Sequence, residues 1–378
     1  MNERLGLQKD AIEGARNLLL NCAEVSKGDH LLILHEDPAL GWYDSEAPAL
    51  VAQVARQLGI KVTLREVGGP DNSYLHSNTR TPGDADLSAN SDDYALVDAG
   101  YDCCIFFARI GDQLRFDPAI EGRRRVMCYV TSLASLASRY GRIKYTALAE
   151  LKQAIDNVML SATDIAISCP LGTNLRGRLH DRPCASSDEV SVLRFPVGVH
   201  APIDASRFSG HVCLARYLTP TGSRVYTPAS VAIAQPVTAE VLDGKIRRYA
   251  GNVADVQNIE RHYANVASKF ALDSKRVLSW HAGIHPGCHY IERVDDNPDR
   301  WSNTVFTNPR FVHFHTCGNS APGEICWMVC DPTIAIDGVP LWDFGTLRPE
   351  RVTQTEACLQ RWPKLRELYA QINGDVGV

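Results

Sequence analysis

The chain has 378 residues, of which 45% are hydrophobic and 22% are charged. This composition is typical of a globular protein and excludes a disordered chain, a collagen and a coiled coil. Asp and Glu (44) slightly outnumber Lys and Arg (39), so the formal net charge is −5. A protein that binds nucleic acid or a membrane surface normally carries a basic stripe. We therefore expect a small-molecule substrate as the partner, and neither nucleic acid nor a membrane.

Targeting features and cysteines indicate the cytoplasm. Residues 1–22 are charged and amphipathic, without the basic head, apolar core and cleavage site of a secretion signal. The sequence contains no run of about 18 apolar residues, so we expect no transmembrane helix. The 12 cysteines are scattered, several of them in apolar runs such as 103–107, and none forms a CxxC pair. Buried free thiols are the better interpretation, and we predict a reduced, cytoplasmic protein.

A chain of this length normally forms two domains, and residues 1–160 have the pattern of the first. Strands alternate with helices there, which predicts a Rossmann-like α/β domain around a parallel sheet. No GxGxxG follows the first strand and no GxxxxGK[ST] is present, so a dinucleotide or P-loop site is not supported. The polar segment 68–93 predicts a long loop. The predicted strands are 30–36, 60–67, 103–109 and 123–132, and the predicted helices are 1–25, 46–59 and 145–162.

Strands dominate residues 161–378, which predict a β-rich α+β domain. Turn residues separate them, among them Asp243-Gly244 and Asp337-Gly338, and such pairs are typical of antiparallel hairpins. One helix interrupts the strands at 253–270, and residues 354–372 form a helical tail. The predicted strands are 163–169, 190–198, 211–218, 225–237 and 238–251, followed by a hairpin over 331–345.

Histidines gather in two short stretches of this second domain. Imidazole and carboxylate groups on adjacent strands or loops are the ligands that a catalytic metal site requires. A single buried histidine is more often a core residue, but a group beside Gly and Pro turns favours metal binding. The residues concerned are His281, His285 and His289 in the first stretch, His313 and His315 in the second, and Glu324 shortly after them.

The two stretches differ in expected local structure. In the first, the histidines recur every four residues, but Gly283 and Pro286 argue against a helix. A strand that ends in a turn fits better, so these three side chains need not converge. In the second, His313 and His315 alternate with apolar residues and share one face of a strand. One of the two can bind metal while the other contacts substrate or supports a ligand.

Several segments carry a family resemblance over about residues 160–345, with a weaker match before them. They resemble the aminopeptidase T family of metallopeptidases, together with two non-peptidase relatives, 2,5-dihydroxypyridine dioxygenase and 5-nitroanthranilate aminohydrolase. The metal-binding motifs of the family correspond to HAGIHPG (281–287), VHFHTCGN (312–319) and EIC (324–326). The other matching segments are GTNLRGR (172–178), FPVGVHAP (195–202) and DPTIAIDG (331–338).

The resemblance implies a set of metal ligands. His281 replaces a family Glu, His313 matches a family His, and Glu324 and Cys326 replace the His and Asp of an HxD motif. His200 lies near the place of a further metal-binding Glu. The implied set is therefore His281, His313 and Glu324, which suits one divalent transition metal: Mn, Fe, Co or Zn. The carboxylates of the two-metal peptidase site are largely absent, which argues against peptidase activity. The family also implies a homo-oligomer.

Three functions remain open. The leading hypothesis is a metal-dependent hydrolase like the aminohydrolase relative, in which water attacks a small aromatic, amino-substituted, carboxylate-bearing substrate and ammonia leaves. The alternative is a non-haem Fe(II) dioxygenase that opens a hydroxylated ring, because two histidines and one carboxylate form the facial triad of such enzymes. The third is a family member that binds a small molecule without catalysis.

Further residues are assigned roles under the hydrolase hypothesis. His315 or His289 is expected to move the proton, because imidazole titrates near neutral pH. An arginine can hold a substrate carboxylate through a bidentate pair, although a solvated surface charge is the alternative for any single arginine. The candidate substrate contacts are His200, Arg176 and Arg293, with Arg178 as a further arginine.

Overall fold

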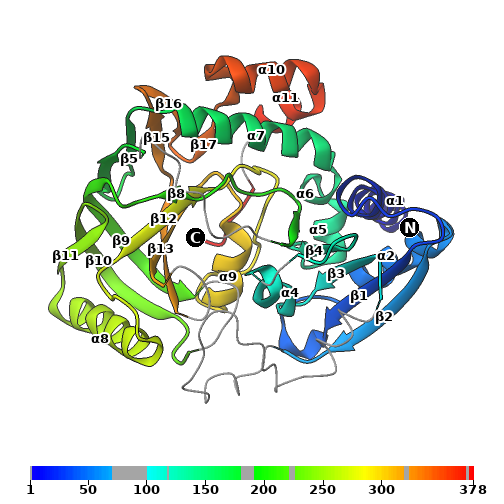
Figure 1. Cartoon of the computed structure of the whole chain (residues 1–378), viewed down its shortest axis with the longest axis horizontal. Coiled ribbons are helices and arrows are strands. Elements are labelled where there is room, and N and C mark those ends of the chain that lie inside the picture. The colour runs from blue at the N-terminus through cyan, green and yellow to red at the C-terminus, as the bar shows by residue number, and fades with distance from the viewer. Residues whose placement is uncertain are drawn as a thin grey trace. The chain divides into compact units, whose positions relative to one another are not determined.

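The computed structural model shows a mixed α/β chain with one parallel and one antiparallel sheet, which confirms the predicted fold class (Figure 1). The described part of the chain divides into two compact units, the first running to Thr146 and including 191–196. No described helix is both long and apolar enough to cross a membrane. The structure describes residues 2–69, 100–116, 119–179, 191–220, 226–318, 323–371 and 374–378.

The first unit is built on a five-stranded parallel sheet in the order β2-β1-β3-β4-β7. Its central strand β3 (Cys103–Phe107) is buried at every position, as expected for an apolar run covered on both faces. Its strands are β1 (His30–Glu36), β2 (Lys61–Val67), β3, β4 (Arg124–Cys128) and β7 (Leu193–Phe195). Its helices are α1 (Asn2–Arg16), a π-helix (Asn17–Cys22), α2 (Glu46–Gln57), α4 (Ile110–Gln113), α5 (Leu133–Ala137) and α6 (Arg139–Arg142), with 3₁₀ turns at Pro38–Leu40 and Leu114–Phe116.

One strand corrects the sequence prediction. Residues 190–198 were expected among the antiparallel strands of a domain 161–378, yet β7 pairs in parallel with β4 at the edge of the first sheet. A short strand pattern contains no information about its distant pairing partner, so chain position misled the assignment. The predicted loop 68–93 lies mostly outside the described residues.

The second unit contains a large antiparallel sheet in the order β17-β16-β15-β5-β6-β9-β14-β13-β12-β8, with β10 pairing β9 and β11. The hairpins at Asp243-Gly244 and Asp337-Gly338 are confirmed, and all four turn residues have positive φ. Its strands are β5 (Ile165–Ser168), β6 (Asn174–Gly177), β8 (Ile203–Asp204), β9 (Phe208–Pro220), β10 (Val231–Leu242), β11 (Lys245–Ala250), β12 (Val277–Ala282), β13 (Phe311–Cys317), β14 (Glu324–Cys330), β15 (Thr333–Ile336), β16 (Val339–Asp343) and β17 (Thr346–Leu347).

The helices of the second unit follow local signals. Asn252 caps the predicted helix by accepting a hydrogen bond from the backbone N–H of Ala254 at 2.9 Å. The helical tail is broken at Trp362, because Pro363 cannot continue the preceding helix. The helices are α7 (Tyr145–Ser161, all but its first two residues in this unit), α8 (Val253–Phe270), α9 (Pro298–Val305), α10 (Thr353–Arg361) and α11 (Pro363–Tyr369), with a 3₁₀ turn at Pro349–Arg351.

The two faces of β12 and β13 have opposite chemistry. Trp280 and Phe314 are fully buried on one face, where Trp280 packs edge-on against Phe208 at 5.8 Å between ring centroids. His281 and His313, the next residue on one strand and the preceding one on the other, point to the opposite face. The alternation of aromatic and histidine residues therefore places an apolar core behind the strands and imidazoles in front of them.

Candidate metal centre

Strand pairing brings the two histidine stretches together. In the register of β12 and β13, His281 lies opposite His313, and Ser279 lies opposite His315. Directly opposite residues of antiparallel strands project from the same face, so the three imidazoles share it. As predicted, the first stretch is a strand that ends in a turn, and His313 and His315 share one face of the second strand.

The imidazole nitrogens converge. Nε2 of His281 is 3.2 Å from Nδ1 of His313, and one potential ligand atom from each of His281, His313 and His315 lies within 4.8 Å of the others. The ring centroids are 4.8–5.0 Å apart. Within the described ranges, no other three His, Cys, Asp or Glu residues meet in this way.

This donor set fits a transition metal. Bonds of about 2.0–2.1 Å at tetrahedral angles set ligand nitrogens about 3.3 Å apart, close to the separation of His281 and His313. His315 completes three neutral nitrogen donors, the number found in catalytic zinc sites with a position left for water or substrate. The residues present can therefore hold one divalent ion, and the donor types do not distinguish among Mn, Fe, Co and Zn.

The site is largely shielded from solvent. His281 and His313 are 2% and 7% exposed, and the side chain of His315 is 13% exposed. Phe306 packs against two of the imidazoles, with centroid distances of 6.1 Å to His281 and 5.9 Å to His313. Phe306 is not among the site residues predicted from the sequence, because a position directly after a helix carries no signal of proximity to the histidines.

Glu324 lies beside the third imidazole of the group. Its Oε1 lies 2.7 Å from Nδ1 of His315, and its side chain is 1% exposed. The sequence implied Glu324 as the third ligand and His315 as a proton carrier. The geometry instead gathers His315 with His281 and His313, and sets the Glu324 carboxylate beside His315. The ligand role of Glu324 remains a prediction.

His200, a predicted substrate contact, binds the backbone through both ring nitrogens. Its Nδ1 bonds the carbonyl of Ala201 at 2.6 Å, and its Nε2 accepts from the N–H of Ala282 at 2.9 Å. Asp156 holds the same segment by accepting from the N–H of Ala201 at 2.7 Å. Burial lowers the pKa of His200 to about 4, so the ring stays neutral. With both nitrogens engaged, it fastens the end of β12 next to His281.

The other predicted site residues lie outside the histidine group. Arg176 pairs with Asp164 at 2.6 Å with 71% of its side chain exposed, and Arg293 pairs with Asp295 at 3.1 Å with 79% exposed. Both geometries are those of solvated surface charges. Nδ1 of His289 lies 3.3 Å from the carbonyl oxygen of Gly287. The structure does not gather these residues with the converging imidazoles.

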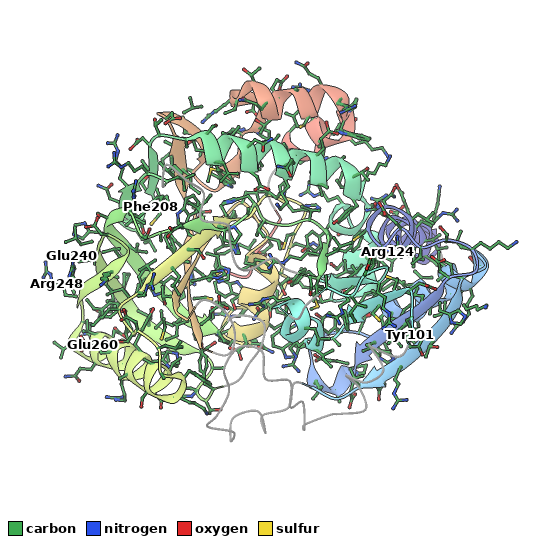
Figure 2. All side chains as sticks on the ribbon, viewed as in Figure 1. Tyr101, Arg124, Phe208, Glu240, Arg248 and Glu260 are labelled. Atoms are coloured by element: carbon green, nitrogen blue, oxygen red, sulfur yellow. The ribbon has the colours of Figure 1, made fainter. Side chains whose placement is uncertain are left out.

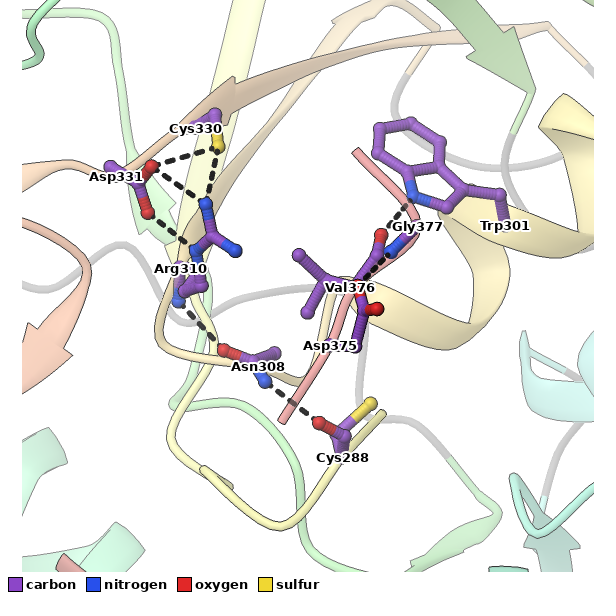
Figure 3. Close-up of polar contacts among 9 residues, drawn as sticks. All are labelled: Cys288, Trp301, Asn308, Arg310, Cys330, Asp331, Asp375, Val376 and Gly377. Atoms are coloured by element: carbon purple, nitrogen blue, oxygen red, sulfur yellow. Dashed lines mark hydrogen bonds and ion pairs between the residues drawn. The ribbon is translucent and has the colours of Figure 1, made fainter. Parts of the chain in front are cut away.

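Side-chain contacts brace the connection between the two histidine strands (Figure 3). Nδ2 of Asn308 donates to the carbonyl of Cys288 at 2.8 Å, which links the two ends of the connection to each other. Arg310, next to the start of β13, donates through Nε and Nη2 to the carboxylate of Asp331 at 2.7 and 2.8 Å. Such bidentate pairs resist sliding, so they help to hold β13 in register.

The last residues of the chain fasten the same connection. Val376 is fully buried, and its carbonyl accepts a hydrogen bond from Nε1 of Trp301 at 2.8 Å (Figure 3). The N–H of Tyr290 donates to the carbonyl of Asp375 at 2.7 Å, in a short parallel bridge. The segment that follows His281 is therefore pinned by the carboxyl-terminal residues.

Comparison with known proteins shows the fold. No protein-family model and no curated protein matches the chain. The solved structure of 2,5-dihydroxypyridine dioxygenase from Pseudomonas putida KT2440 is similar, with a TM-score of 0.58 and 13% identity over 92% of this chain and 98% of that one. Wild-type AmpT from Thermus thermophilus aligns over 88% and 94% of the two chains, with a TM-score of 0.45 and 12% identity. The first likeness establishes a common fold, in keeping with the resemblance found in the sequence.

Proposed function

We propose that the protein is a metal-dependent hydrolase that replaces an amino group of a small aromatic substrate with a hydroxyl group and releases ammonia. The observation that carries the proposal is the convergence of three imidazoles from β12 and β13. A divalent ion held by three such donors lowers the pKa of a coordinated water to about 7 and so supplies a nucleophile at neutral pH.

The surrounding residues favour redox-neutral chemistry. Non-haem Fe(II) oxygenases typically use two histidines and one carboxylate, whereas here the carboxylate oxygen Oε1 of Glu324 lies 2.7 Å from Nδ1 of His315. Cys326 lies opposite His315 in the strand register and on the same face. A thiol near an oxygen-activating centre is exposed to oxidation, while hydrolysis leaves it unchanged.

The immediate neighbours favour an aromatic substrate. Phe306 brings an apolar ring next to His281 and His313, and aromatic rings pair well with one another in offset or edge-on contact. Arg176 and Arg293, predicted to hold a substrate carboxylate, are occupied by surface acids. The aromatic part of the substrate proposal therefore has support from the site, and the carboxylate part has none from these two arginines.

A ring-cleaving dioxygenase is the second candidate, favoured by the fold. The similar solved structure, which aligns with 92% of this chain, is that of a 2,5-dihydroxypyridine dioxygenase. If Glu324 rather than His315 were the third ligand, the donor set would be a facial triad. The two candidates differ in the origin of the oxygen atom in the product.

An anaerobic assay in ¹⁸O-labelled water tests the proposal. The protein is supplied with Mn²⁺ or Zn²⁺ and with amino-substituted nitroarenes such as 5-nitroanthranilate. We expect one ammonia per product molecule and one ¹⁸O in the new hydroxyl group. Product that lacks the label, or that forms only after air is admitted, means the dioxygenase candidate is right. His313→Ala should be inactive, while His211→Ala, a matched change at an exposed position of β9, should retain activity.

A further inference from the structure

Glu324 and His315 are diagonal neighbours on adjacent strands. In the register of β13 and β14, His315 faces Cys326, and Glu324 faces Cys317. Because side chains two residues apart on a strand share a face, Glu324 projects from the same face as Cys326 and therefore as His315. The contact between the carboxylate and the imidazole follows from this register.

The contact brings a carboxylate oxygen to one nitrogen of the His315 ring. Nδ1 of His315 and Oε1 of Glu324 are 2.7 Å apart, within the distance range of an ion pair. An ionised carboxylate only accepts hydrogen bonds, and imidazole is the stronger base of the two. We accordingly assign the proton of this contact to Nδ1 of His315.

The opposite side of the ring is available. With the proton on Nδ1, a neutral imidazole has its lone pair on Nε2. Nε2 of His315 has no hydrogen-bond partner among the residues that the structure describes. The ring centroid of His315 lies 5.0 Å from that of His281 and 4.8 Å from that of His313.

Glu324 is itself held in place. It begins β14, where pairing with Cys317 fixes its backbone. The hydroxyl of the buried Tyr226 donates to the carbonyl of Glu324. Its side chain is 1% exposed, against 13% for that of His315, so the carboxylate lies deeper in the protein than the imidazole it contacts. A carboxylate placed this rigidly can orient its partner.

We propose that Glu324 is a positioning residue: it fixes the ring orientation and tautomer of His315, so that Nε2 of His315 is the third nitrogen offered to a metal ion. This inference rests on the proposed metal centre and adds the role of the carboxylate in it. Partners of this kind behind a metal-binding histidine typically contribute 10–100-fold to metal affinity. The acid of the EIC motif thus acts through His315 rather than on the ion.

A double-mutant cycle on zinc affinity tests the inference without any activity assay. The dissociation constant for Zn²⁺ is measured by chelator competition for the full-length wild type, Glu324→Gln, His315→Ala and the double variant. We expect Glu324→Gln to weaken binding about 10-fold or more, and His315→Ala to weaken it further. In the His315→Ala background, Glu324→Gln should change the affinity by less than about 3-fold, because the carboxylate has lost the group through which it acts.

The control is Glu240→Gln, the same chemical change on β10, where Glu240 accepts from Nε of Arg248 at the surface (Figure 2). It should leave zinc affinity unchanged. A second readout uses the zinc-loaded wild type alone: nitrogen-15 NMR should show His315 protonated at Nδ1 and bound through Nε2. This measurement decides the question if Glu324→Gln does not fold.

The outcomes separate this inference from the proposed function. Equal losses from Glu324→Gln in both backgrounds, or a zinc-bound Nδ1 of His315, would overturn the positioning role while leaving a metal centre intact. A wild-type affinity for His315→Ala with a large loss for Glu324→Gln would make Glu324 the ligand. If His281→Ala and His313→Ala bind zinc as tightly as the wild type, the metal centre itself is wrong.

Discussion

Two clusters of buried polar side chains, one in each unit, differ in how their members are paired. In the first unit, Glu36 is fully buried at the end of β1 and meets Arg109, which is 6% exposed and follows β3. Arg109 donates to Glu36 through its backbone N–H, Nε and Nη2 at 2.5–3.0 Å, and its guanidinium lies 4.3 Å from the ring centre of Trp42. The donors of Arg109 match the acceptor oxygens of Glu36, so the two residues satisfy each other.

The histidine cluster of the second unit brings together like groups instead. His281, His313 and His315 each have one basic nitrogen when neutral. Nε2 of His281 and Nδ1 of His313 lie within hydrogen-bond distance at 3.2 Å, but two imidazoles lack the opposite charges of an acid and a guanidinium. Gathering them offers little stability, so the arrangement is better explained by a ligand that uses their lone pairs together. Complementary buried charges indicate a structural role, and convergent like donors indicate a site.

The largest expected effect breaks the second cluster. His313→Ala should weaken zinc binding by more than about 100-fold, the upper end of the range for supporting residues, because it removes a donor outright. The free energy of unfolding measured with a chelator present should change by no more than about 2 kcal/mol, as for many buried substitutions. Chelator competition and urea unfolding check the two expectations. A variant that fails to fold would make His313 structural.

The next effect breaks the first cluster. Arg109→Met leaves the Glu36 carboxylate buried without its partner and should lower the free energy of unfolding by about 3–5 kcal/mol. Arg248→Met, which removes the exposed partner of Glu240 (Figure 2), should cost less than about 1 kcal/mol. Urea unfolding of both variants measures these two changes in the free energy of unfolding. A small cost for Arg109→Met would mean that the closed pair is not the stabilising feature that its geometry indicates.

A third histidine sharpens the comparison through pH. His262 on α8 is 4% exposed, neither ring nitrogen has a hydrogen-bond partner within the described ranges, and burial lowers its pKa to about 4. The unfolded chain therefore takes up this proton first, and stability is lost as the pH falls from about 6.5 towards 4, by roughly 1.4 kcal/mol per pH unit.

The matching variant is His262→Leu. It should retain or gain stability at pH 7, because no hydrogen bond of the ring is lost, and its unfolding free energy should fall less steeply with acid than that of the wild type. Urea titrations at pH 7, 6 and 5 measure the difference in slope, with His211→Leu at an exposed position as control. Parallel slopes for wild type and His262→Leu would show that His262 does not titrate in this range.

The smallest effects are expected at the two surface arginines. Arg176→Ala and Arg293→Ala remove guanidinium groups already paired with Asp164 and Asp295 in solvent, so both variants should retain the turnover and melting temperature of the wild type. Steady-state kinetics on the substrate that passes the labelled-water test provide the measurement. A strong rise in KM for either variant would restore the substrate-binding role predicted from the sequence.

Local patterns in the sequence were sufficient for most elements. The apolar run 30–36 is β1, the helix 253–270 is capped by Asn252, and the hairpins turn at the predicted Asp-Gly pairs. These features depend on residues close together in the chain, where backbone preferences and side-chain periodicity act directly. The parallel pairing of β7 with β4 depends on residues far apart in the chain, and for this strand the sequence predicted the wrong sheet.

By itself, the sequence determined that His313 and His315 share a strand face and that His281 ends another strand, because the side-chain period of a strand is two. Only the tertiary structure decided which strands are neighbours and in what register. That register sets His281 opposite His313 and puts Glu324 beside His315, two residues along β14 from the position directly across. The tertiary structure also places both ring nitrogens of His200 in hydrogen bonds with backbone groups. Strand pairing is a long-range interaction that shifts every side chain to the other face if it slips by one residue, so the spacing of residues along the chain does not encode it.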